Sequence, residues 1–134
     1  MIEVNLYIVG HLIGALAMLH LADEEVDELC GIDANNEAKV KELFRRFLVP
    51  EFESFEPKNK QRLKEALKYL LCFGNDDLFQ LVTNMNEPPF EFPDPPIKYF
   101  IWLWEELFDD ESYKIENINQ YIVNNKFGTN NYFE

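Results

Sequence analysis

The stretch from Pro95 to Glu111, PPIKYFIWLWEELFDDE, constrains the fold of this chain more than any other. Its prolines suit the first turn of a helix, and the residues from Tyr99 to Phe108 are apolar apart from two glutamates. At about 100° of rotation per residue, the apolar side chains cover more than half of the circumference of a helix. A helix that is apolar over so wide an arc is normally central in its domain. We therefore predict a central aromatic helix over Ile97 to Asp110.

Trp102 falls in the remaining polar arc of this helix, among three carboxylates. Large aromatic side chains are mostly buried, so one interpretation is that another segment covers the indole. The other interpretation is that Trp102 is an exposed anchor for a protein partner and that the carboxylates pair with cations of that partner. The second interpretation gives a candidate partner-binding site formed by Trp102, Glu105, Glu106 and Asp109.

Charge is the next constraint on function. The chain has 134 residues, which suits one domain over residues 1–134, and its 47% hydrophobic content is ample for a core. The formal net charge of −13 disfavours binding to nucleic acid or to an anionic membrane and favours a basic protein partner, although acidity also simply keeps proteins dissolved.

The charge is unevenly distributed along the chain. Met1 to Ala38 holds eight acids and no Lys or Arg, whereas Lys39 to Lys68 holds nine bases and five acids. Tyr69 to Glu134 holds three bases and twelve acids. A basic middle third thus separates two acidic arms, and we expect part of it to neutralise those arms within the fold.

A second dense group of acids lies in DEEVDELC, from Asp23 to Cys30, which we predict to be a short helix ending at Gly31. A solvated helix face is the common meaning of such a cluster. The alternative is that it extends the partner-binding surface, through Asp23, Glu24, Asp27 and Glu28.

The apolar stretch from Ile2 to Ala22 resembles a signal peptide or a membrane span only superficially. No Lys or Arg precedes Lys39, so the basic region of a signal peptide is missing. We predict a buried helix over Ile2 to Ala22, with a first strand from Glu3 to Val9 as the competing interpretation, because apolar and polar residues alternate there.

The rest of the chain shows helical periodicity and clear helix boundaries. We predict helices from about Asp33 to Leu48, where Pro50 stops the helix, from Pro57 to before Gly74, from Asp76 to about Asn86, and from Tyr113 to Asn124, with an extended proline-rich arm over Glu87 to Pro96. Together these elements predict an all-α, single-domain bundle of five to seven helices around the central aromatic helix.

Signatures of catalysis and of bound groups are missing from the sequence. Cys30 and Cys72 make no metal-ligand spacing, no glutamate is followed three residues later by histidine, and there is no glycine-rich phosphate loop. We expect both cysteines to be buried, reduced thiols of a cytoplasmic protein, with one disulfide between them as the open alternative. We therefore expect no cofactor, no metal and no enzymatic activity.

In size, acidity and aromatic-plus-carboxylate surface, the chain resembles bacterial immunity proteins, the antidotes to nuclease toxins of colicin-type and contact-dependent inhibition systems. The stretches DEEVDE at Asp23 to Glu28 and WLWEELFDDE at Trp102 to Glu111 carry this resemblance. It implies a basic toxin nuclease domain as partner, tight 1:1 binding and no enzymatic activity. Two other classes stay open: a helical adaptor or homodimer that associates through its aromatic helix, and an enzyme whose site includes His11, His20 or a cysteine.

Overall fold

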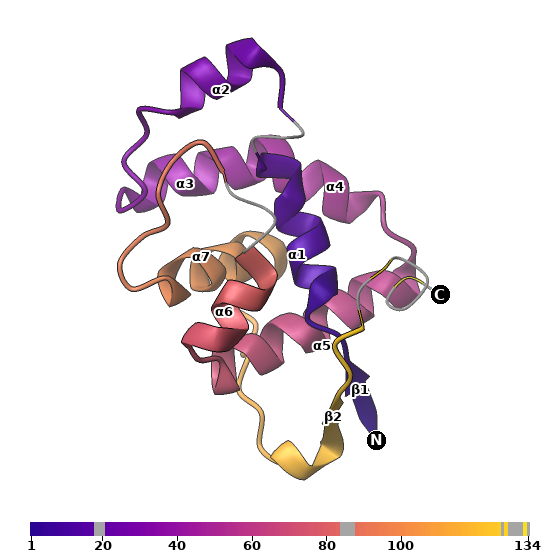
Figure 1. Cartoon of the computed structure of the whole chain (residues 1–134). Helices are drawn as coiled ribbons and strands as arrows, with labels where there is room; N and C mark the ends of the chain where they lie inside the picture. The colour runs from indigo at the N-terminus through magenta and orange to yellow at the C-terminus, as the bar shows by residue number, and fades with distance from the viewer. Residues whose placement is uncertain (18–20, 84–87, 127, 129–132, 134) are drawn as a thin grey trace.

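The computed structural model describes residues 1–17, 21–83, 88–126, 128 and 133. Helices pack around α1 and α7, with α2 at one end of the molecule and a small sheet of β1 and β2 at the other (Figure 1). The elements in chain order are β1 (Ile2–Val4), α1 (Tyr7–Ile13), η1 (Gly14–Leu16), α2 (Asp23–Leu29), α3 (Glu37–Leu43), η3 (Phe44–Leu48), α4 (Val49–Glu53), α5 (Pro57–Phe73), α6 (Asp76–Thr83), α7 (Ile97–Phe108), η4 (Ile118–Gln120) and β2 (Tyr121–Val123). The predicted single helical domain is confirmed, and the sheet is an addition to it.

The predicted aromatic helix is α7, and its rings contact several other elements. The ring of Tyr99 packs edge-on against Phe44 of η3 and against Phe92, each with ring centroids 4.9 Å apart. The ring of Phe100 stacks on Phe79 of α6 at 5.5 Å. Phe44 precedes α5 in the chain, whereas Phe79 and Phe92 follow it. The rings of α7 therefore connect core residues from both sides of α5 in the sequence.

Helix α5 also follows the sequence closely. Pro57 opens the helix, and Gly74 follows its last residue. Its predicted core face is buried throughout and consists of Leu63, Ala66, Leu67, Leu70 and Leu71. Residues 88–96 contain no helix, as expected for the proline-rich arm; Glu87 lies outside the described residues.

The N-terminal stretch combines both interpretations of its sequence. β1 is a strand, and α1 begins at Tyr7, where the Asn5 side chain accepts the Tyr7 backbone N–H at 3.0 Å. The prediction of one unbroken helix to Ala22 is wrong, because η1 ends at Leu16 and the backbone of Ala17 is extended. Residues 18–20 lie outside the described part.

Pro50 does not stop its helix, contrary to the sequence prediction. α3, η3 and α4 run without a break, and η3 is a π-type turn with a wider hydrogen-bond spacing than the α-helix. Pro50 therefore falls in the first turn of α4, where its missing N–H is no loss.

The predicted final helix from Tyr113 to Asn124 is also wrong. This segment holds only the short turn η4 and the strand β2, which pairs in parallel with β1. Asparagine and β-branched residues, which favour helices poorly, are frequent in the segment. Two asparagines instead fix the strand: Asn124 donates to the Glu3 carboxylate at 2.7 Å, and Asn125 accepts the Leu6 backbone N–H at 2.8 Å.

Among the described residues, no helix combines the length and the apolar composition that crossing a bilayer requires.

Two glycines give a matched test of the close packing where α5 meets α6. A Cβ on Gly74 would lie 2.2 Å from the Leu70 carbonyl oxygen and 3.1 Å from the Phe79 ring, whereas a Cβ on Gly31 meets nothing within 4 Å. We expect Gly74→Ala to lower the free energy of unfolding by about 1–3 kcal/mol. Gly31→Ala should change it by less than about 0.5 kcal/mol in either direction. Urea denaturation of both variants checks this, and equal midpoints would contradict the packing.

Candidate functional site

The short acidic helix is confirmed as α2. Leu29 on its inner side is buried, and the Glu25 carboxylate accepts the backbone N–H of Ala22 at 2.9 Å, which fixes the start of the helix. The side chains of Asp23, Glu24 and Asp27 are exposed and form no ion pair with any residue that the structure describes. These three carboxylates therefore present negative charge at the surface that no neighbouring cation offsets.

Glu28, the fourth predicted acid of α2, is paired with Arg46. The guanidinium donates to both carboxylate oxygens, at 2.8 and 3.3 Å. This charge-assisted hydrogen bond lowers the pKa of Glu28 and raises the pKa of Arg46. The pair attaches α2 to η3, the element that precedes Pro50.

The glutamates of α7 are paired in the same way with cations of the segment α3–η3. Glu105 lies 3.2 Å from the ammonium of Lys41, and Glu106 lies 2.8 Å from the guanidinium of Arg45. Burial lowers the pKa of Lys41, but hydrogen bonds to Glu105 and Glu37 outweigh it, so the pKa is raised. The expected neutralisation of the acidic arms by the basic middle third is therefore present at Lys41, Arg45 and Arg46.

Trp102 is covered, with an exposed fraction of 7%, and belongs to the hydrophobic core. Its arc of α7 is the one that carries Glu105 and Glu106, and both of these reach cations of the segment α3–η3. That segment packs against α7. The structure thus agrees with the interpretation of Trp102 as a core residue, and the candidate partner surface is reduced to its carboxylates.

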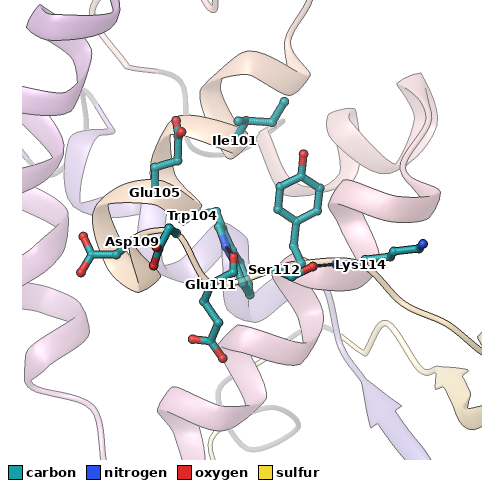
Figure 2. A pocket seen from close by; sticks show the side chains of 9 residues that line it. Ile101, Trp104, Glu105, Asp109, Glu111, Ser112 and Lys114 are labelled. Atoms are coloured by element: carbon teal, nitrogen blue, oxygen red, sulfur yellow. Dashed lines mark hydrogen bonds between the residues drawn. The ribbon is translucent and has the colours of Figure 1, made fainter.

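The C-terminal end of α7 borders an open depression of about 400 Å³, shown in Figure 2. Trp104 is one of its lining residues and donates its indole N–H to the Glu111 carbonyl at 2.6 Å. The side chains of Glu105, Asp109 and Glu111 point in different directions around Trp104 (Figure 2). Carboxylates that diverge do not form a convergent acid–base pair or a metal cage, but they present charge to a broad partner surface.

Asp109 is exposed and has a backbone φ of 54° and ψ of −126°. The Phe108 carbonyl accepts the Glu111 N–H at 3.1 Å, so these residues form a type II′ turn with Asp109 at the position that normally requires glycine. Asp109 and Asp110 form no ion pair among the described residues, whereas Glu111 pairs with Lys64. The turn therefore holds two uncompensated carboxylates beyond the end of the helix.

The structure brings the two predicted acidic groups to either side of one helical segment. α3 lies between α2 and α7 in Figure 1, and its continuation η3 supplies cations to both. Three of the predicted acids, Glu28, Glu105 and Glu106, are paired within the chain, and four, Asp23, Glu24, Asp27 and Asp109, are not. Asp110 was not predicted as a site residue. Its position next to Asp109 in the acidic run DDE could have indicated that it belongs to the same surface.

Across the described residues, no three His, Cys, Asp or Glu side chains gather so that they could hold a metal ion. Compared with known proteins, the chain matches no protein-family model, no curated protein and no solved structure.

The burial of Trp102 leads to a stability prediction. Trp102→Ala removes a large side chain from the core and should lower the free energy of unfolding by about 3–5 kcal/mol. Ile118→Ala, at a side chain that is 46% exposed, should change it by less than about 0.5 kcal/mol. Denaturant titrations followed by circular dichroism measure both, and a Trp102→Ala variant as stable as the parent would place the indole outside the core.

The conformation of Asp109 predicts a stabilising substitution. Asp109→Gly relieves the strain of a positive φ and should raise the free energy of unfolding by about 1 kcal/mol or more. Asp110→Gly removes the same charge from the neighbouring residue, whose φ is not positive, and should give no gain. Thermal unfolding of the pair separates strain from charge, since relief of acidic repulsion would stabilise both variants equally.

Proposed function

We propose that this chain is a small acidic inhibitor of a basic protein, of the kind represented by bacterial immunity proteins, and that it is not an enzyme. The observation that carries the proposal is the set of exposed, unpaired carboxylates on α2 and in the turn after α7. Three cations on α3 and η3, Lys41, Arg45 and Arg46, are already engaged by other acids. The remaining negative charge is thus available to a partner.

The proposed partner is a toxin nuclease domain. A nuclease binds phosphates with Lys and Arg, and a surface of carboxylates can pair with those same cations and mask the active or substrate-binding surface. Opposite charges also speed the encounter, which suits an antidote that must act before its toxin. Because both cysteines are free thiols, the proposal includes a reducing, cytoplasmic location.

The competing adaptor hypothesis placed an oligomer interface on the aromatic helix. The apolar face of α7 is buried within the chain and is therefore not available to a partner. Its buried residues are Tyr99, Phe100, Trp102, Leu103 and Trp104. The enzyme hypothesis required a deep pocket lined by His11, His20 or a cysteine; the depression beside α7 is lined by none of them, and His20 lies outside the described residues. Neither observation favours these classes over the inhibitor.

Charge reversal on α2 tests the proposed function. The tagged chain is used to capture partners from its native host, and a captured basic nuclease is then purified and assayed with the chain at a 1:1 ratio. We expect suppression of nuclease activity. The double variant Asp23→Lys, Asp27→Lys should slow association by about tenfold or more at low salt, and the difference should shrink as salt rises.

A double variant elsewhere on the surface is the matched control. Glu91→Lys with Glu116→Lys makes the same change in net charge at two exposed residues that form no ion pair among the described residues. It should associate nearly as fast as the parent. If both double variants slow association equally, the slowing comes from the change in net charge and not from the position of the carboxylates on α2. A captured partner that is neither basic nor inhibited would exclude the proposed function.

A further inference from the structure

The exposed apolar surface of the described residues is concentrated at one end of the molecule. The large hydrophobic side chains with high exposure are those of Met1, Ile118, Ile122 and Val123, at 83, 46, 50 and 38%. All belong to the small sheet, its first flanking residue or the turn η4 that leads into it. This end lies opposite α2 (Figure 1). It is therefore separate from the acidic helix α2.

Among the described residues, β2 has one strand partner and one open edge. Its partner β1 is paired in the register Ile2 with Tyr121, Glu3 with Ile122 and Val4 with Val123. The Asn124 N–H donates to the Val4 carbonyl at 2.9 Å, so the backbone groups of Ile122 and Asn124 point toward β1. Backbone direction alternates along a strand, and the N–H and C=O of Val123 therefore point away from β1. Neither group has a hydrogen-bond partner in the part of the chain that the structure describes.

The usual protections of an open edge are largely missing here. Natural edge strands carry lysine, proline, a bulge or a covering segment, because an unpaired edge is a template for another strand. Residues 117–125 include no charged residue and no proline, in a chain whose net charge is −13. Two copies can approach along this neutral segment with less repulsion than the rest of their sequence would impose.

We propose that β2 pairs antiparallel with β2 of a second copy of the chain, across a twofold axis at Val123, to form a four-stranded sheet. In this arrangement each Val123 N–H donates to the Val123 carbonyl of the other copy. The pairing is self-complementary because one residue offers both the free donor and the free acceptor, which is the requirement of an isologous interface. In this register the two Val123 side chains face each other across the axis, and each Ile122 side chain lies opposite Asn124 of the other copy.

A dimer through so short a strand buries little area and is weak, with a dissociation constant on the order of 10⁻⁵–10⁻⁴ M. Since both copies are strongly acidic, added salt screens their repulsion and strengthens the dimer. Binding of a basic partner responds to salt in the opposite direction. The two interactions are therefore distinguishable on the same protein.

Sedimentation of the full chain over a range of concentrations around that dissociation constant tests the proposal. We expect a monomer–dimer equilibrium that becomes tighter as ionic strength rises from about 0.01 to about 0.5 M. Ile122→Lys should weaken the dimer at least tenfold, because it replaces an apolar side chain of the shared sheet by a cation and places the two lysines at diagonal positions on the same face. Val123→Pro should weaken it to a similar degree, because it removes the free N–H without removing a bond to β1.

Gln120→Lys is the matched control, since it adds the same charge to an exposed side chain just outside the strand. It should leave the dimer within about twofold of the parent. If Val123→Pro fails to fold, Ile122→Lys alone decides. The proposal is overturned by a monomer at every concentration, by a dimer that Ile122→Lys leaves intact, or by equal weakening with Gln120→Lys.

Discussion

The packing of aromatic rings on α7 is the constraint on which the rest of the structure depends. Tyr99 and Phe100 reach η3, the proline-rich arm and α6, and Trp104 reaches Phe108 and Tyr113. Rings in these edge-on and stacked arrangements contribute about 0.5–1.5 kcal/mol each beyond the area they bury. Because one helix makes all of these contacts, it also fixes where its own C-terminal end emerges. The acidic turn after α7 is therefore presented by a helix whose aromatic side chains are largely buried.

The sequence predicted those elements whose structure follows from local periodicity. α5 and α7 carry apolar residues at helical spacing between clear boundary residues, and the structure keeps both helices. Local reasoning failed at β2, because a strand of three residues owes its existence to β1, far away in the sequence. It failed at Pro50 because the effect of a proline depends on the hydrogen-bond register of the preceding turn, and the π-type turn of η3 is not visible in composition.

The same distinction applies to the candidate site. Charge distribution along the chain predicted that basic residues of the middle third would neutralise the acidic arms, which is the case for Lys41, Arg45 and Arg46. It could not show which acids would be left unpaired, since that depends on which carboxylates lie within reach in space. An exposed ion pair contributes only about 0–1 kcal/mol to the free energy of unfolding. These pairs therefore affect the surface potential more than they affect stability. Likewise, helical periodicity placed Trp102 among carboxylates, but its burial depends on packing between elements, which periodicity does not show.

The parallel pairing of β1 with β2 also affects the order in which the domain forms. The hydrogen bond from Asn124 to Glu3 joins residues 121 positions apart, whereas the helical ladders join near neighbours. Contacts of such long sequence separation form late, after local helices have assembled. During translation β1 is made before β2 and lacks its strand partner until Val123 has been added. The pairing of the two strands is thus a late step of folding, and the nascent chain carries β1 as an unpaired strand until that step.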